Sequence, residues 1–208
     1  EAGYTIASRL TDGVVHVEFE IRPTDDSIDV MTAREHRAEA RSIQRLLTPR
    51  SVAVIGASRS RDKVGHALVR NLVRGGFTGP VYAVNPDATA VSGVPAYPTV
   101  RDVPGEVDLA LVAVPADAVM DVVLDCAARG VRGLVVVSAG FAETGPDGRK
   151  RQGELVRIAR SYGMRVVGPN CLGIVNTDPA YSLNASMAPV VPPPGRVGFF
   201  SQSGALGI

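Results

Sequence analysis

A short apolar run that ends in glycine constrains the fold of this chain more than any other segment. Residues 51–56 read Ser-Val-Ala-Val-Ile-Gly, and a helical pattern of apolar residues begins at about Val64. A buried parallel strand that stops at a glycine and turns into a helix leaves backbone N–H groups and the positive end of the helix dipole facing outward. The segment therefore predicts a phosphate-binding loop in a Rossmann-like domain.

The glycine spacing argues against a dinucleotide as the ligand. After Gly56 the next glycine is Gly65, so the G-x-G-x-x-G fingerprint is absent. The second expected strand ends at Asn85, whereas an NAD site usually places Asp or Glu there to accept hydrogen bonds from the ribose diol. An NAD-dependent oxidoreductase is therefore disfavoured. Asn85 either contacts another cofactor or serves only the Asn-Pro turn that it forms with Pro86.

Strands and helices alternate along the chain from residue 51 onward. The runs at 109–114 and 134–137 are continuously apolar, which is typical of parallel strands covered on both faces. The sequence thus predicts an α/β protein with a Rossmann-like, doubly wound parallel sheet that binds its ligand at the carboxyl ends of the strands. The pattern places strands near 51–56, 80–84, 108–114, 133–138, 164–168 and 196–200, and helices near 64–75, 116–129, 147–162 and from 204.

The segment before this domain is expected to form a β-hairpin and a helix. Residues 4–21 alternate apolar and polar side chains around a Thr-Asp-Gly turn, which predicts a hairpin remnant whose sheet is not part of this chain. Residues 23–29 are expected to be a polar linker. Residues 32–47 then form a helix, with Thr32 as N-cap and Glu35 completing a capping box.

The loops at the expected strand ends supply the candidate site residues. The first loop holds hydroxyl and cationic groups suited to phosphates, at Ser58, Arg59, Arg61 and Lys63. Asp117, after Pro115, either caps the next helix or contacts the ligand. The small residues after Ser138 would let a ligand approach the backbone, and an exposed Phe141 would pack against an aliphatic arm or an adenine.

The cysteines, the last serine-containing turn and the histidines are not expected to act as nucleophiles or metal ligands. Cys171 has no nearby histidine to activate it, so a packed or ligand-lining thiol is favoured, and Cys126 is expected in the core. The turn from Ser201 to Gly204 predicts an anion cradle at a helix start, since it lacks the G-x-S-x-G pattern of a serine nucleophile. The three histidines are expected on the surface, and no Cys/His cluster has zinc spacing.

Composition limits the partners. The net charge of +1 favours neither nucleic acid nor an anionic membrane, and no apolar run approaches the roughly 18 residues that span a bilayer. Two cysteines in 208 residues suggest reduced thiols and a cytoplasmic location. Because the chain begins at Glu1 and stops at Ile208, inside an expected helix, we interpret it as a piece of a longer protein.

Six segments together resemble the CoA-binding domain of NDP-forming acyl-CoA synthetases, which are similar to the α subunit of succinyl-CoA synthetase. The resemblance covers about residues 46–208. It rests on Val-Ala-Val-Ile-Gly-Ala-Ser at 52–58, Val-Asn-Pro at 84–86, Val-Pro-Ala at 114–116, Ser-Ala-Gly-Phe-Ala-Glu at 138–143, Gly-Pro-Asn-Cys-Leu-Gly at 168–173 and Phe-Ser-Gln-Ser-Gly-Ala-Leu-Gly at 200–207.

The resemblance implies coenzyme A, or acyl-CoA, as the ligand. The residues implicated by motif are Gly56, Ser58, Arg59, Lys63, Val64, Asn85, Pro115, Ser138, Gly140, Phe141, Pro169, Asn170 and Cys171. The loop of Ser201, Gln202, Ser203 and Gly204 matches the one that receives a phosphorylated catalytic histidine. That histidine and the ATP-grasp part, which would bring ATP or ADP and Mg²⁺, belong to domains outside this chain. The fragment should therefore bind CoA without turnover.

The expected domain layout follows from these segments. Residues 1–24 look like the closing hairpin of a GNAT acetyltransferase, 25–48 form a linker and helix, 49–192 form the CoA-binding domain, and 193–208 begin a second, flavodoxin-like domain. The expected partners are the upstream GNAT domain and the downstream synthetase domains, and a homo-oligomer is left open. The alternative to a synthetase lobe is a ligand-sensing module of a GNAT-type protein lysine acetyltransferase.

Overall fold

The chain divides into two compact units, residues 1–44 and residues 45–208. The structure is a computed structural model that describes residues 6–19, 22–188 and 190–202. Each unit is described by itself. Within the described residues, no helix is both long enough and apolar enough to cross a membrane.

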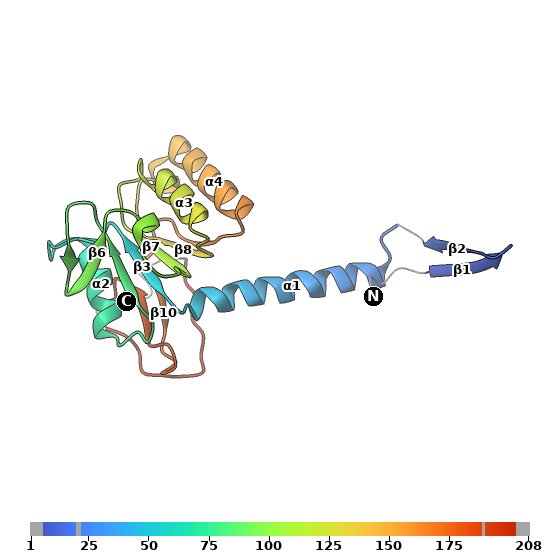
Figure 1. Cartoon of the computed structure of the whole chain (residues 1–208), viewed down its shortest axis with the longest axis horizontal. Coiled ribbons are helices and arrows are strands. Elements are labelled where there is room, and N and C mark those ends of the chain that lie inside the picture. The colour runs from blue at the N-terminus through green and yellow to red at the C-terminus, as the bar shows by residue number, and fades with distance from the viewer. Residues whose placement is uncertain (1–5, 20–21, 189, 203–208) are drawn as a thin grey trace. The chain divides into compact units, whose positions relative to one another are not determined.

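The first unit contains the predicted hairpin. Strands β1 (Ile6–Thr11) and β2 (Val14–Phe19) pair antiparallel through a two-residue turn at Asp12 and Gly13, whose φ angles are +51° and +79°. Two positive φ angles are those of a type I′ turn, which Asp-Gly favours. The prediction of a hairpin is confirmed (Figure 1).

Helix α1 (Asp25–Leu47) begins seven residues earlier than the sequence suggested. The backbone N–H of Thr24 donates to Ser27 Oγ at 2.8 Å, and the N–H of Ser27 donates to Thr24 Oγ1 at 3.2 Å. This reciprocal cap, together with Asp25 and Asp26 in the first turn, starts the helix before Thr32. The predictions of a polar linker at 23–29 and of an N-cap at Thr32 are therefore wrong.

A seven-stranded sheet forms the centre of the second unit, in the order β5-β6-β4-β3-β7-β8-β9. Only the β5–β6 pair is antiparallel, so the predicted Rossmann-like α/β fold with a mostly parallel sheet is confirmed. The short strands β5 and β6 were not predicted. The strands are β3 (Val52–Ile55), β4 (Val81–Val84), β5 (Ala90–Val91), β6 (Val94–Tyr97), β7 (Leu109–Val112), β8 (Gly133–Val136) and β9 (Arg165–Val167).

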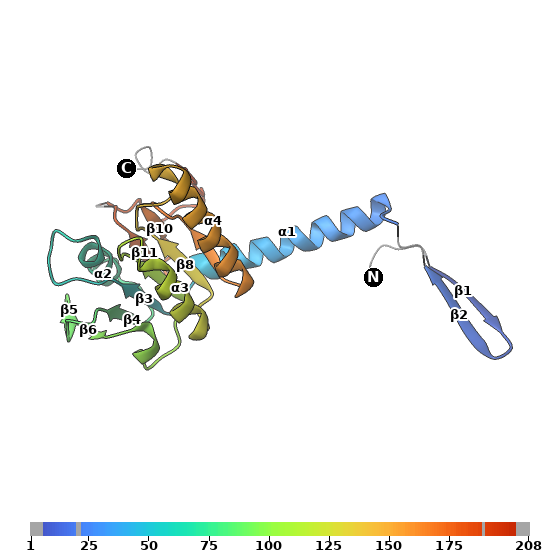
Figure 2. The same cartoon turned by 90° about the horizontal axis from the view of Figure 1, so that it is seen from above.

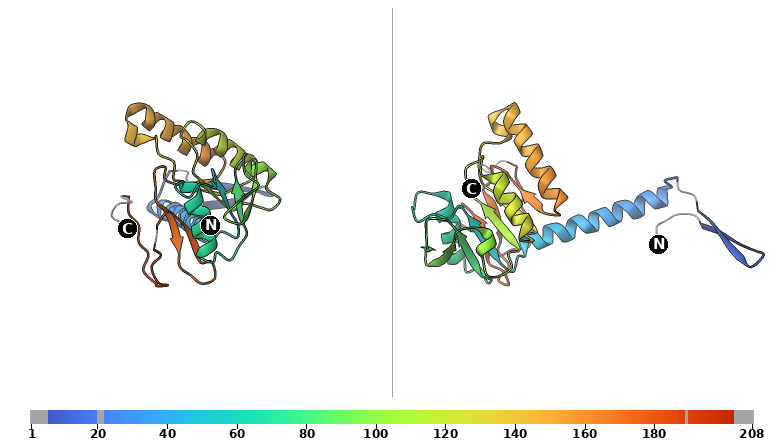
Figure 3. Two further views of the ribbon diagram at one scale, coloured as in Figure 1. Left: turned by 90° about the vertical axis from the view of Figure 1, so that its left-hand side faces the viewer. Right: turned by 45° about the horizontal axis from the view of Figure 1, so that its top comes forward.

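Both faces of the sheet are covered, as its continuously apolar strands require. Helices α3 (Val119–Ala128) and α4 (Pro146–Ser161) lie side by side over one face (Figures 1 and 3). The other face carries helix α2 (Val64–Arg74) and an antiparallel hairpin of β10 (Gly173–Asn176) and β11 (Leu183–Ser186) (Figure 3), whereas Figure 2 looks onto the side that α3 and α4 cover. Two short 3₁₀ helices, η1 (Val100–Asp102) and η2 (Ala142–Thr144), lie in loops.

The alternation of side chains along each strand divides the core into two halves. Val52 and Val54 of β3 pack with α2 and β11, whereas Ala53 and Ile55 pack with α3 and α4. All four residues are buried. Strand β3 is therefore held on both faces, which fixes where its carboxyl end lies.

The strand expected at 196–200 is not formed in the described segment 190–202. A strand needs a pairing partner and a face to bury. Val197, Phe199 and Phe200 have neither among the described residues, where they are 94%, 77% and 84% exposed. The helix expected from 204 lies outside the described residues.

Candidate functional site

The candidate site lies where the sheet topology reverses. From β3 the chain passes through α2 to β4 on one side and later returns to β7 on the other side of β3. In doubly wound sheets, ligands bind at such a switch point, beside the carboxyl ends of the two strands. The loop after β3 is anchored there, since the N–H groups of Gly56 and Ala57 donate to Val84 O at 3.1 and 3.2 Å.

Two glycines let helix α2 pack directly against this loop. Gly56 has φ +85°, and a Cβ there would overlap the carbonyl oxygen of Ala113 in the neighbouring loop. A Cβ on Gly65, in the first turn of α2, would overlap the carbonyl oxygen of Gly56. The loop between them, which we call the first loop (residues 56–64), is thus pressed against the helix start.

The first loop combines a helix start that has no side-chain cap with exposed cationic side chains. Lys63 is the N-cap of α2, and no side chain caps that end of the helix. Arg59, Arg61 and Lys63 are exposed, and Val64 is 41% exposed. Uncapped N–H groups at a helix start, preceded by a loop that carries exposed cationic side chains, favour a bound anion such as phosphate.

Asn85 holds the first loop through a side-chain hydrogen bond to its backbone. Its Nδ2 donates to Ala57 O at 2.6 Å, and its Oδ1 accepts from the N–H of Asp87 at 2.7 Å. Both ends of the amide are thus engaged within the protein, which gives a structural reason for an amide here rather than an acid. A carboxylate could not donate to Ala57 O.

His66 provides a second support that the sequence analysis missed. Its Nδ1 lies 3.0 Å from Ser58 O, and because a carbonyl oxygen only accepts, Nδ1 carries the hydrogen. Ser58 in turn accepts, through Oγ, from the N–H of Ser60 at 3.2 Å. The histidines were expected on the surface, but His66 is half-buried, and its contact eight residues back depends on how the loop folds over α2.

The loops after β7, β8 and β9 are tied to one another beside the first loop. Ser138 Oγ donates to Val114 O at 2.6 Å, next to Pro115. Asn170 N–H donates to Ser138 O at 3.0 Å, so Pro169 and Asn170 are held against the β8 loop. The structure therefore brings the predicted residues from these three loops together, although the Ser138 hydroxyl hydrogen is already engaged.

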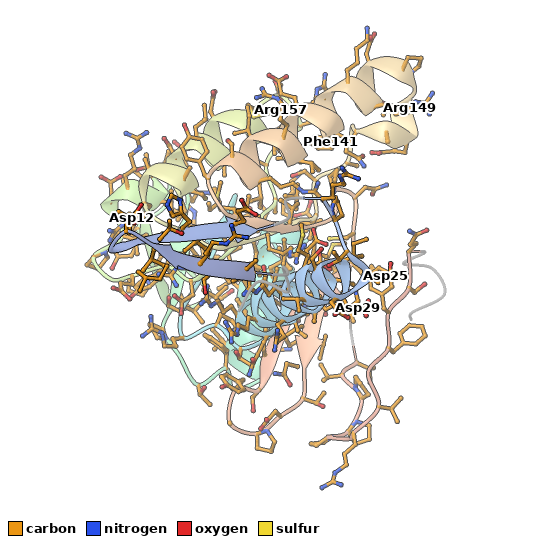
Figure 4. All side chains as sticks on the ribbon, turned by 90° about the vertical axis from the view of Figure 1, so that its right-hand side faces the viewer. Asp12, Asp25, Asp29, Phe141, Arg149 and Arg157 are labelled. Carbon is orange, nitrogen blue, oxygen red and sulfur yellow. The ribbon has the colours of Figure 1, made fainter. Side chains whose placement is uncertain are left out.

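Phe141 does not lie where the sequence analysis expected it. Its side chain is only 1% exposed and belongs to the core beneath α3 and α4, together with Leu155 and Ala159 (Figure 4). The expectation of an exposed ring is wrong, because the loop folds its aromatic residue inward and buries it under α4. Phe141 therefore anchors the loop, and any contact with a ligand falls to its backbone.

The surroundings of the two thiols disfavour their reactive thiolate form. Cys171 Sγ donates to Val136 O at 3.4 Å, and burial raises the pKa of this thiol, partly offset by the N–H groups of Gly173 and Cys171. Burial, with a smaller contribution from Asp125, raises the pKa of Cys126 to about 12. Both thiols are therefore protonated near neutral pH, which disfavours nucleophilic catalysis.

We expect iodoacetamide at about pH 8, near the pKa of a free thiol, to modify native Cys171 slowly and native Cys126 not at all. In urea both should react at the rate of an ordinary thiol. Mass spectrometry of timed samples measures the two rates. A native Cys171 that reacts as fast as in urea would contradict the environment described here.

Other polar features lie apart from these loops. A cavity at the opposite, amino edge of the sheet is lined by Arg45, Arg50, Arg132 and Tyr181, among others, but Arg50 there is already bound by Asp108 and Glu106 at 3.2 Å each. Ser201 is half-buried and Gln202 exposed, whereas Ser203 and Gly204 lie outside the described residues. Within the described part of the chain, no group of three His, Cys, Asp or Glu residues could hold a metal ion.

Comparison with known proteins agrees with this geometry. The profile of the CoA binding domain family matches residues 50–177, more than half of the chain. The chain is 48% identical over 164 residues to acetate–CoA ligase [ADP-forming] I of Archaeoglobus fulgidus, covering 79% of this chain and 23% of that one. It is 48% identical over 159 residues to acetate–CoA ligase [ADP-forming] II subunit alpha of Pyrococcus furiosus, covering 76% of this chain and 34% of that one.

A solved structure gives the same result. The dinucleotide-forming acetyl-coenzyme A synthetase 1 of Candidatus Korarchaeum cryptofilum, in complex with phosphate and ADP, is similar with a TM-score of 0.74 and 45% identity, over 79% of this chain and 35% of that one. The chain thus spans about a quarter to a third of the length of these proteins. It belongs to the CoA binding domain family and is homologous to the CoA-binding region of ADP-forming acetate–CoA ligases, including that of a ligase α subunit.

Proposed function

We propose that this chain binds CoA, or acyl-CoA, at the carboxyl edge of its sheet, as the cofactor lobe of an ADP-forming acyl-CoA synthetase. The observation that carries the proposal is the first loop, where the uncapped start of α2 and three exposed cationic side chains face outward. CoA carries several phosphate charges, and this surface can neutralise them.

The remaining loops would hold the rest of the cofactor. Pro115, Ser138, Gly140, Pro169 and Asn170 come from three loops that hydrogen bonds and close packing join into one surface. Main-chain groups and small residues there can lie along a flexible arm. In this proposal Asn85 and Phe141 shape the loops, and Cys171 lines the site without reacting.

The chemistry of the whole synthetase is also a proposal. It would convert acyl-CoA, phosphate and ADP to the free acid, CoA and ATP. Phosphate would displace CoA to give an acyl phosphate, a histidine would take the phosphoryl group and release the acid, and ADP would take it from the histidine. In this proposal Ser201 to Gly204 receive the phosphohistidine, while the histidine and the groups that bind ADP and Mg²⁺ belong to other domains.

The assignment of residues 1–24 to a GNAT domain stays a prediction, because the family match begins at residue 50. The hairpin does expose apolar side chains on one face, with Ile6, Leu10 and Val17 at 68%, 70% and 56%. A lone hairpin of this kind is marginal in water, so it suits a larger sheet. The cytoplasmic location and a homo-oligomer likewise remain predictions.

Calorimetric titration of the chain with CoA, with NAD as the parallel control, tests the proposed function. We expect heat of binding with CoA and none with NAD. Binding of NAD without CoA would overturn the proposal in favour of an oxidoreductase. A folded chain that binds neither would also contradict it.

The support from Asn85 yields a matched pair of variants. Asn85→Ala should weaken CoA binding about tenfold, because the hydrogen bond to Ala57 O that shapes the first loop is lost. Asn176 is the control: its Nδ2 donates to Leu47 O and its Oδ1 accepts from the Asp178 N–H, both at 3.0 Å. Asn176→Ala should cost about the same stability, roughly 1–2 kcal/mol, and leave CoA affinity unchanged.

A further inference from the structure

The backbone of Gly140 is held on both sides by charged side chains. Its N–H and that of Phe141 donate to the same carboxylate oxygen, Oε1 of Glu143, at 2.5 and 3.1 Å. Its carbonyl oxygen accepts from Nη1 of Arg151 at 2.7 Å. Glu143 lies in η2 and Arg151 in the second turn of α4. Two elements that follow the loop therefore both form hydrogen bonds to the backbone of Gly140.

The residues after Gly140 are fixed in the same way. Thr144 Oγ1 donates to Phe141 O at 2.8 Å, and Ala142 N–H donates to Gln152 Oε1 at 3.3 Å. The buried ring of Phe141 anchors this stretch from beneath. The tip of the loop is thus fixed by hydrogen bonds with residues that follow it in the chain. Ala139, next to Gly140, remains exposed.

The position of Gly140 matters to the proposed site. Its φ is +103°, and a Cβ there would lie 2.8 Å from the Cβ of Ala116 in the loop after β7. Gly140 is therefore a second point, besides the hydrogen bond of Ser138, at which the loops after β7 and β8 meet. A shift of its peptide would move Ser138 and Ala139 relative to Pro115.

We propose that Glu143 and Arg151 are positioning residues, which form a charged clamp on Gly140 and so set the 138–140 backbone for CoA. This inference rests on the proposed function. Neither side chain need touch the cofactor, since each acts through the main chain. In keeping with this geometry, hydrogen bonds from the N–H groups of Gly140, Phe141 and Glu143 lower the pKa of the Glu143 carboxyl, so it is ionised near neutral pH.

The clamp can be tested on the 208-residue chain by calorimetry with CoA. Glu143→Ala and Arg151→Ala should each weaken binding about tenfold, as loss of a charge-assisted hydrogen bond predicts. The double variant should be weakened by little more than either single one, because both side chains hold the same residue. Glu143→Gln keeps an acceptor oxygen and should recover most of the affinity.

Glu154 supplies the control, as an exposed glutamate farther along α4. Glu154→Ala should leave the affinity unchanged. Amide hydrogen exchange gives a readout without cofactor. The amides of Gly140 and Phe141 should exchange faster in Glu143→Ala than in the wild type. In Glu154→Ala they should exchange at the wild-type rate. Unchanged exchange at both amides would overturn the clamp.

Failure of the clamp and failure of the proposed function give different results. If the wild type binds no CoA, the proposed function fails and the positioning role falls with it. If the wild type binds CoA and Glu143→Ala binds it equally well, only the clamp is overturned. Fully additive losses in the double variant would also contradict a grip on one shared residue.

Discussion

Gly65→Ala should destabilise the chain by about 3 kcal/mol, the upper part of the range for overpacking a close contact. The added Cβ would meet the carbonyl group of Gly56, which is backbone and cannot rotate away. Helix α2 would have to move outward, although its Leu68, Val69 and Leu72 are fully buried against the sheet. The first loop would move with it, so CoA affinity should fall at least tenfold.

Gly153→Ala is the matched control for this substitution. Gly153 is an exposed residue within α4, and a Cβ there would meet nothing within 4 Å. Alanine should therefore stabilise the helix by roughly 0.5–1 kcal/mol. Urea unfolding of both variants measures the two changes, and equal effects would show that the contact between Gly65 and Gly56 is not tight.

Replacing two cations of the first loop should have the largest effect on binding. The double variant Arg59→Ala with Lys63→Ala should weaken CoA binding about 100-fold, if each side chain makes one charge-assisted hydrogen bond to phosphate. Stability should change little, because both side chains are exposed. The difference in CoA affinity between the wild type and the double variant should become smaller at high salt. Salt screens the attraction between the cationic side chains and the phosphates, which only the wild type retains in full.

The chain contains only one other lysine, Lys150, which serves as control. Lys150 lies on α4 and forms an exposed ion pair with Asp147 at 3.6 Å. Such pairs contribute little, so Lys150→Ala should change neither stability nor CoA affinity. If Lys150→Ala weakened binding as much as the loop variant, general charge rather than the first loop would account for the affinity.

The central architecture could be predicted from the sequence because its signals are local. Continuous apolar runs mark strands β7 and β8, and Gly56 followed by a helical pattern marks the β3–α2 turn. These patterns depend on neighbouring residues, and the parallel arrangement follows from their alternation with helices. These local signals are therefore sufficient to predict the carboxyl edge of the sheet as the candidate site.

The errors arise where distant residues decide the outcome. Phe141 follows small residues in a loop, and only the packing of α4 over it explains its burial. The start of α1 was misplaced because Thr24 and Ser27 cap each other, whereas Thr32 and Glu35 offered an equally good local pattern. The roles of Asn85 and His66 depend on carbonyl groups of a folded loop, which a sequence pattern does not position.

The hairpin of β10 and β11 was missed for a related reason. Asn184 and Ser186 are buried polar residues in β11, and Ser186 Oγ donates to Asn184 Oδ1 at 2.7 Å. Asn71 of α2 donates through Nδ2 to Ser186 O at 2.8 Å, from 115 residues away in the chain. Polar side chains that pair only after folding hide the apolar alternation by which a strand is recognised.

Mapping CoA onto the backbone amides by NMR tests the central claim most directly. We predict that CoA shifts amide signals in the first loop, at Ser138–Gly140 and around Pro169–Cys171. The cavity at the amino edge, near Arg45, Arg50 and Arg132, should stay unchanged. Shifts confined to that cavity, with the carboxyl-edge loops unaffected, would contradict the account.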